Sequence, residues 1–172
     1  MLLAVIALTV FVLDQGTKLL VLNSLKENAL VPVLGEVLQF HLVKNAGAAF
    51  SLLSGSTWIF AIAASVVVVV IVVFSRRIRS LGWAAVFGLL LGGTTGNLYD
   101  RLFREPGFGL GHVIDFIQVQ YFPAIFNIAD IGITSAMGLF ILLTLRGIGL
   151  DGVRVPRRVP AAPAESPVES PE

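Results

Sequence analysis

Long stretches without charge dominate this chain and restrict what it can fold into. Residues 45–75 and 80–99 contain no charged side chain, and residues 116–145 contain only Asp130. A bilayer core about 30 Å thick is crossed by roughly 20 mostly apolar residues in a helix. With residues 1–22 as a further apolar stretch, the sequence predicts a membrane protein that crosses the bilayer several times.

The composition supports this interpretation and excludes several classes of protein. Charged residues make up 13% of the 172 residues, against about a quarter in soluble domains. This leaves too little polar surface for a soluble enzyme, a nucleic-acid-binding protein or a disordered regulator. The chain has no cysteine, so it can form no disulfide, thiol nucleophile or thiolate metal site.

We expect a mainly α-helical, polytopic membrane protein, because a backbone in lipid must satisfy its own hydrogen bonds. Transmembrane helices are expected near residues 1–22, 58–74, 81–98 and 127–145. Arginines cluster after the second and the fourth of these spans. The positive-inside rule therefore places both clusters, and both termini, in the cytoplasm. The two longer connections then face outward.

The first outward connection contains a predicted β region at about residues 30–50, because apolar and polar side chains alternate from Val37 to Asn45. The second outward connection is expected to form a short outer helix or loop. Together with the spans, these parts make one membrane domain of residues 1–147. Residues 148–172 end in a run rich in Pro, Ala, Ser and Glu, and we expect them to form a disordered cytoplasmic tail.

Two opposite charges lie deep in the first span. Lys18 follows Asp14 by four residues, so both side chains lie on the same helical face. Charged groups at this depth are costly, and we expect the two to pair. The residues leave open whether the pair anchors the helix structurally or contacts a substrate.

The end of the third span combines small and polar residues. Gly92 and Gly96 are four residues apart, a spacing that lets a neighbouring helix approach closely. Asn97, Asp100 and Arg101 follow, and they share roughly one face if the helix continues. The Arg101 guanidinium there can hold a carboxylate or peptide carbonyls, or it can extend to a lipid phosphate.

Two aspartates with apolar neighbours are the strongest candidates for catalysis. Asp115 lies in an outward loop, and Asp130 lies about one turn into the fourth span. Pro123 between them allows the chain to fold back and bring them together. Two neighbouring carboxylates in a poorly hydrated site share a proton, so one can activate a water while the other protonates a leaving group. The spacing alone leaves open two separate structural aspartates.

Other hydrolytic chemistries have weaker support. The only histidines are His41 and His112, and there is no His-Glu-x-x-His motif for a zinc protease. Ser51, Ser54 and Ser56 precede the second span without a Gly-x-Ser-x-Gly turn. The sequence therefore favours carboxylate chemistry.

Five short motifs occur in order between about residues 14 and 135. They are Asp14–Lys18, Asn45–Ser51, Gly92–Arg101, Val113–Phe116 and Phe126–Asp130. Together they resemble the motifs of bacterial lipoprotein signal peptidase, also called type II signal peptidase. Each motif is weak by itself, but the ordered set is specific.

The resemblance implies an aspartyl endopeptidase of the bacterial cytoplasmic (inner) membrane, with its active site near the outer face and with neither metal nor cofactor. Members of this family remove signal peptides from prolipoproteins by cleaving just before a cysteine that carries a diacylglyceryl group. The expected partners are therefore such prolipoproteins, membrane lipid and globomycin-type inhibitors, and no nucleic acid.

The resemblance also implies roles for single residues. Asp115 and Asp130 match the two catalytic aspartates. The positions implied to bind substrate are Asn45, Asn97, Arg101 and Asn127. The positions implied to support the structure are Asp14, Lys18, Gly92, Gly96 and Asp100. The predicted outward β region resembles the small sheet that cradles the substrate in this family. The alternatives are another intramembrane aspartyl protease, acting on unlipidated segments, and a small ion-coupled transporter.

Overall fold

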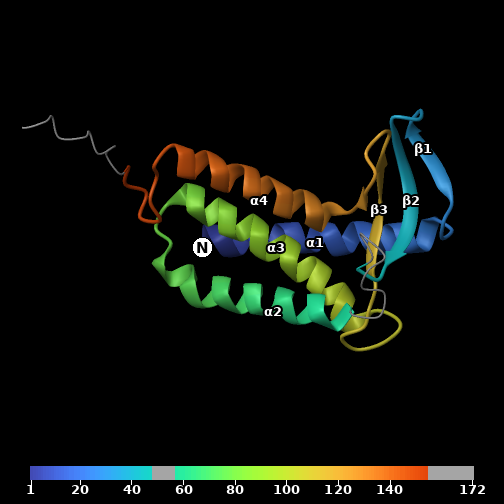
Figure 1. Ribbon diagram of the computed structural model, residues 1–172, viewed down its shortest axis with the longest axis horizontal. Coiled ribbons are helices and arrows are strands. Elements are labelled where there is room, and N and C mark those ends of the chain that lie inside the picture. Colours follow the sequence, from blue (N-terminus) through green and yellow to red (C-terminus); the bar gives the residue numbers. More distant parts are fainter. Residues whose placement is uncertain (48–56, 155–172) are drawn as a thin grey trace, which may run out of the picture.

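The computed structural model describes residues 1–47 and 57–154 as long helices with a small sheet at one end (Figure 1). The helices are α1 (Leu2–Ser24), α2 (Thr57–Phe74), α3 (Leu81–Phe103) and α4 (Ile128–Leu145), with a short 3-10 turn, η1 (Ser75–Arg77), after α2. The strands are β1 (Leu30–Leu34), β2 (Leu38–Asn45), β3 (Val113–Val119) and β4 (Ile125–Phe126). The predicted fold class, mainly helical with a small sheet, is confirmed.

Each of the long helices is long and apolar enough to cross a membrane. Their outward faces expose large apolar side chains, for example Val66, Val69 and Val73 on α2. Such an apolar surface is unfavourable in water, but it matches the hydrocarbon core of a bilayer. The helices therefore fit a multi-pass membrane protein.

Helix α3 is the centre of the bundle, since it contacts α1, α2 and α4 and lies between α2 and α4 in Figure 1. Its glycines make this packing possible. A methyl group on Gly92 would overlap the α1 backbone, and one on Gly93 would overlap the α4 backbone. Gly96 instead leaves room for the Asp14 carboxylate. The glycine run thus admits two helices and one charged side chain.

Helix α3 also runs further than predicted, ending at Phe103 rather than near residue 98. The polar residues at its C-terminal end do not stop the helix, because Asn97 and Asp100 are buried and bonded to other elements. This extension places both side chains beside the end of α1.

The sheet is antiparallel with the strand order β1-β2-β3-β4. Strand β3 corrects the expectation that Asp115 lies in an outward loop. The strand was missed because Val113, Ile114, Asp115 and Phe116 are all buried, so the sequence shows no alternation of apolar and polar residues. A paired strand holds Asp115 more firmly than a loop.

A hydrophobic cluster joins the sheet to the helices. It consists of Val21 on α1, Leu42 on β2, and Ile114 and Phe116 on β3. Because these side chains are buried together, β3 is fixed against the C-terminal end of α1. The sheet lies at the opposite end of the bundle from the N-terminus (Figure 1).

At the end of the bundle that holds the N-terminus, the chain after α4 packs against the start of α3 (Figure 1). The Leu150 carbonyl accepts hydrogen bonds from the amides of Arg79 and Ser80, at 3.1 and 3.0 Å. The Ile148 carbonyl accepts one from Trp83 Nε1 at 2.9 Å. The packed chain thus continues past residue 147 to Arg154, and the rest of the predicted tail lies outside the described residues.

Candidate active site

Asp130 lies in the first turn of α4 and is held by the cap of its own helix. Asn127 is the N-cap: its Oδ1 accepts a hydrogen bond from the Asp130 amide, and Asp130 Oδ2 accepts one from the Asn127 amide, both at 3.1 Å. This capping box satisfies two N–H groups that have no partner within the helix. Asp130 Oδ1 accepts a third bond, from Asn97 Nδ2 of α3 at 2.8 Å.

Asp115 lies on β3 and is held by side chains from two other parts of the chain. Its Oδ2 accepts a hydrogen bond from Asn45 Nδ2 of β2 at 2.7 Å. Its Oδ1 accepts one from Asn127 Nδ2 at 2.6 Å. Asn127 thus caps the helix of Asp130 and also bonds to the other aspartate.

The two aspartates line one cavity of about 450 Å³. The chain turns back between them because β3 and β4 form a hairpin in which Ile117 pairs with Phe126. Apolar side chains, among them Phe122 and Ile125, form much of the remaining wall. The structure therefore brings the two aspartates to a common, largely apolar space.

Burial raises the pKa of Asp115 to about 6. The hydrogen bond from Asn45 opposes this rise, the charge of Asp130 adds to it, and the bond from Asn127 opposes it again. A carboxyl group with this pKa can hold or release a proton near neutral pH, which is a property of general acids and bases.

Asn97 joins this pair to a charged cluster. Its Oδ1 accepts hydrogen bonds from Lys18 Nζ and from Asn127 Nδ2, both at 3.1 Å. Because its Nδ2 donates to Asp130, every polar atom of the Asn97 side chain is bonded within the protein. Asn97 therefore fixes the relative positions of α1, α3 and α4 at the cavity.

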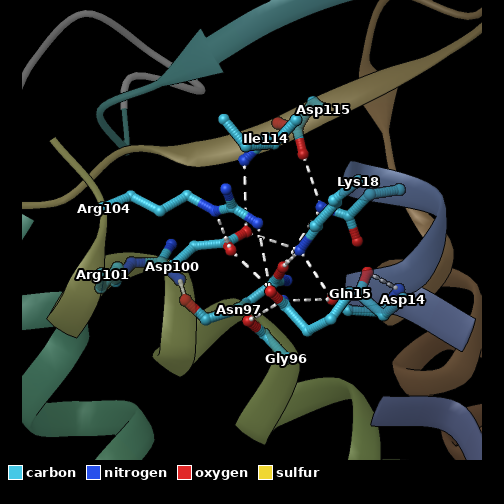
Figure 2. Close-up of polar contacts among 12 residues, drawn as sticks. Asp14, Gln15, Lys18, Gly96, Asn97, Asp100, Arg101, Arg104, Ile114 and Asp115 are labelled. Atoms are coloured by element: carbon cyan, nitrogen blue, oxygen red, sulfur yellow. Dashed lines mark hydrogen bonds and ion pairs between the residues drawn. The ribbon is translucent and has the colours of Figure 1, made fainter. Parts of the chain in front are cut away.

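Lys18 lies at the centre of the charged cluster, between two carboxylates (Figure 2). Its Nζ is 2.8 Å from Asp14 Oδ2 and 2.6 Å from Asp100 Oδ2, and the side chains of all three residues are 0% exposed. The expected pair of Asp14 and Lys18 is thus part of a trio that joins α1 to α3. Charges at this depth are tolerated because they are paired.

Each carboxylate of the trio also holds the backbone next to one aspartate of the cavity. Asp14 Oδ1 accepts a hydrogen bond from the Ala129 amide at 2.9 Å, one residue before Asp130. Asp100 Oδ2 accepts one from the Ile114 amide at 3.3 Å, one residue before Asp115. The cluster therefore positions both cavity aspartates through their main chain.

Arg101 is a further cationic side chain near the two aspartates, and one of its donors has no partner among the described residues. It lies over the Phe60 ring, 5.6 Å from the centroid, and its Nη1 donates to the Asn97 carbonyl at 3.2 Å. Its buried Nε has no hydrogen-bond partner among residues 1–47 and 57–154. The charges of Asp115 and Asp130 act on this guanidinium, so it lies within electrostatic reach of both aspartates.

Sequence reasoning gave no role to two residues of the cluster, Gln15 and Arg104. Arg104 Nε donates to Asp100 Oδ1 at 2.5 Å, and its Nη2 donates to Gln15 Oε1 at 3.1 Å. Gln15 Nε2 donates to Asp100 Oδ1 at 3.2 Å. A signal was present for Arg104, because it follows Asp100 by four residues on one helical face.

Other residues singled out in the sequence lie apart from the cavity or outside the described parts. His41 Nδ1 is 2.9 Å from Gln118 Oε1 on the sheet, and His112 lines a different cavity. No group of three or more His, Asp or Glu side chains suited to a metal occurs within residues 1–47 and 57–154. Residues 48–56, which include the three serines and part of the second motif, lie outside the described residues.

Comparison with known families decides the assignment. The family model described as signal peptidase (SPase) II matches residues 6–146. The chain belongs to the signal peptidase II family. This family consists of proteases, so the ion-coupled transporter considered as an alternative is not supported.

Individual members of the signal peptidase II family are similar over most of their length. The lipoprotein signal peptidase of Leifsonia xyli subsp. xyli is 61% identical over 152 residues, which cover 88% of this chain and 70% of that relative. The one from Rhodococcus jostii is 44% identical over 154 residues, covering 90% and 77%.

Solved structures share the fold. A bacterial membrane enzyme determined by the in meso method at 1.9 Å resolution is 31% identical, with a TM-score of 0.74, and the match covers 83% of this chain and 91% of that one. A second such enzyme, at 2.3 Å resolution, is 30% identical with the same TM-score, covering 83% and 87%.

Proposed function

We propose that this protein removes signal peptides from diacylglyceryl-modified prolipoproteins by hydrolysing the peptide bond just before the lipidated cysteine, with Asp115 and Asp130 as the catalytic pair. The observation that carries the proposal is the shared cavity of these two aspartates in a chain that belongs to the signal peptidase II family. Its apolar wall suits a lipidated, membrane-bound substrate.

In the proposed reaction the two carboxyl groups divide the acid and base roles. Asp115, whose pKa burial raises to about 6, holds the proton and donates a hydrogen bond to the scissile carbonyl oxygen. Asp130 takes a proton from a water molecule, whose oxygen attacks the carbonyl carbon. As the C–N bond breaks, the leaving amine receives a proton from the pair, and a new carboxyl end forms. The chemistry needs neither metal nor cofactor.

The asparagines near the pair divide into two proposed groups. Asn97 and Asn127 are buried and their amides are bonded to the two aspartates, so we assign them to positioning rather than to substrate binding. Asn45 also donates to Asp115, but it lines the cavity and is placed to contact an extended peptide as well.

Arg101 is a further proposed substrate contact. Its guanidinium lies against Phe60 near both carboxylates, and it keeps a buried Nε without a partner among the described residues. A peptide carbonyl would satisfy this donor. Such a contact would hold the peptide extended, which is needed because a helical scissile bond does not expose its carbonyl.

The proposed orientation places both termini in the cytoplasm of a bacterium and the catalytic cavity near the outer face of the inner membrane. Arg76, Arg77 and Arg79 lie between α2 and α3, and Arg146 follows α4, at the same end of the bundle as the N-terminus (Figure 1). The positive-inside rule favours the cytoplasm for that end. A diacylglyceryl anchor in the outer leaflet would then hold the scissile bond beside the cavity.

The test uses two synthetic peptides that differ only in the diacylglyceryl group on the cysteine. The purified protein in detergent is expected to cleave the lipidated peptide before the cysteine, with or without a chelator, and globomycin should block cleavage. Equal cleavage of the unlipidated peptide would favour a general intramembrane aspartyl protease. Loss of activity with the chelator would show that the proposed metal-free reaction is wrong.

A further inference from the structure

Arg104 forms the outer end of the charged cluster and follows α3 directly. Its side chain is 17% exposed, whereas those of Lys18, Asp14 and Asp100 are 0% exposed. It also lines a cavity of about 310 Å³ on the outer side, together with Lys44 and His112. Arg104 is therefore a cluster member that solvent at the outer surface can reach.

Arg104 completes the hydrogen bonding of Asp100. Oδ1 of Asp100 accepts from Arg104 and Gln15, and Oδ2 lies against Lys18 and accepts from the Ile114 amide. A carboxylate has about four sites for accepted hydrogen bonds, and all four are used. With Oδ1 held by the planar guanidinium, Oδ2 stays aimed at the strand that carries Asp115 (Figure 2).

Arg104 also balances the charge of the cluster. Lys18 and Arg104 are positive, and Asp14 and Asp100 are negative, so the four charges sum to zero. Without Arg104 the cluster would hold a net negative charge in a region with little water, where charges act over longer distances than in solution.

We propose that Arg104 is a positioning residue of the peptidase: through Asp100 it holds strand β3 against α3, and it keeps the buried cluster neutral beside the catalytic pair. This inference rests on the proposed function, because it concerns the pH at which Asp115 and Asp130 work. Arg104 makes two contributions that can be measured separately. Its planar guanidinium fixes the position of the Asp100 carboxylate, and its charge sets the electrostatic potential at the catalytic pair.

The charged groups that face Asp115 determine in which direction the pH profile moves when the charge of Arg104 is removed. They are Lys18 on α1, Asp130 on α4 and Arg101 on α3, with Asp14 and Asp100 behind Lys18. Removing the positive charge of Arg104 leaves one excess negative charge in this set. Negative charge disfavours ionisation of a carboxyl group, so the pair would bind its proton up to a higher pH.

The experiment compares the pH dependence of kcat/KM for the full-length protein and its Arg104 variants, with the diacylated peptide as substrate. In Arg104→Gln the pH profile is expected to move upward by about half to one pH unit, and the maximal rate to fall. Arg104→Lys keeps the charge but loses the planar contact, so its rate should fall while the profile stays at the wild-type pH. A wild-type profile in Arg104→Gln would overturn the proposal.

Lys44→Gln is the matched control. Lys44 lines the same outer cavity and loses the same charge, but its partners are Glu27 and Glu105, each 3.5 Å away, and its side chain is 35% exposed. Solvent screens this site, so the profile should move much less than in Arg104→Gln. An equal shift in both variants would show a general surface effect and would contradict the proposal.

A double variant covers the case in which Arg104→Gln does not fold. Asp100→Asn combined with Arg104→Gln removes one charge of each sign, so the cluster stays neutral and the profile should return to that of the wild type. A profile that lies about half to one pH unit above that of the wild type would contradict the charge balance. Failure of the proposed function gives a different result, because the wild-type protein itself would then leave the diacylated peptide uncleaved.

Discussion

The two aspartates of the cavity are held by structures of different kinds. Asp130 and Asn127, here called the helix arm, belong to one helical turn and are joined by the two hydrogen bonds of the capping box. Asp115 and Asn45, here called the strand arm, lie on two strands that are far apart in the sequence. The helix arm is therefore local, whereas the strand arm depends on the whole outer sheet.

This difference explains why the charged cluster bonds to both arms. A local helix cap fixes Asp130 relative to α4 but not relative to β3. The Ala129 and Ile114 amides are each held by one carboxylate of the cluster, and Lys18 joins these carboxylates. The distance between the arms is thus set by buried ion pairs together with the direct hydrogen bond from Asn127 to Asp115.

The largest effect is expected when either arm loses its carboxylate. Asp115→Asn and Asp130→Asn should each lower kcat by about a thousandfold or more, because acid–base catalysis needs both groups. The double variant should be only slightly worse than either single one, since residues that act as a unit are not additive. Thermal unfolding in detergent checks the fold, and near wild-type turnover in either folded variant would refute the pair.

Asn127 offers a way to separate the two arms. Asn127→Ala should weaken the helix cap by about 1 kcal/mol and also remove the bond to Asp115. Asn127→Ser keeps a capping oxygen but cannot reach Asp115, so the stability should recover while kcat stays about 10- to 100-fold low. Tm and kcat are measured for both variants and compared with the wild type. Recovery of both values in the serine variant would show that the hydrogen bond between Asn127 and Asp115 is unimportant for catalysis.

The helix arm could be largely anticipated from the sequence. An Asn followed three residues later by Asp, just before an apolar run, is a typical helix start, and the fourth span was expected to begin near Asn127. The pair of Asp14 and Lys18 followed from helical spacing in the same way. Local geometry fixes such contacts, so the sequence alone is enough to predict them.

The strand arm and the outer part of the cluster could not be anticipated in this way. Strand β3 is buried on both faces, so Asp115 was assigned to a loop. Gln15 and Arg104 are distant in sequence, and their contact depends on how closely α1 packs against α3. The hydrogen bonds of Asn97 and Asn127 to the aspartates were also not predictable from helical spacing, because each joins different elements of the fold.

The dependence of activity on pH should reflect the protonation of Asp115 in the strand arm. If Asp115 must hold the proton, kcat/KM should be highest below its pKa of about 6 and fall about tenfold per pH unit well above it. The two carboxyls titrate as a coupled pair, so the measured midpoint belongs to both. A profile that stays level from pH 5 to 9 would contradict the assigned acid role.

The smallest effects on kcat are expected from substitutions of glycines that support one arm each. A methyl group on Gly93 would overlap the α4 backbone at Ala129, beside the helix arm, and one on Gly111 would overlap the carbonyl of Asp100, beside the strand arm. Each substitution by alanine should cost about 1–3 kcal/mol through overpacking and lower Tm. Gly138 has no atom within 4 Å of an added methyl group, so Gly138→Ala is the control and should leave Tm unchanged or slightly higher.

Because the strand arm depends on long-range packing, Gly111→Ala should reduce kcat more than Gly93→Ala when the two variants lose the same amount of Tm. The reverse order would show that the helix arm is the less rigid of the two arms.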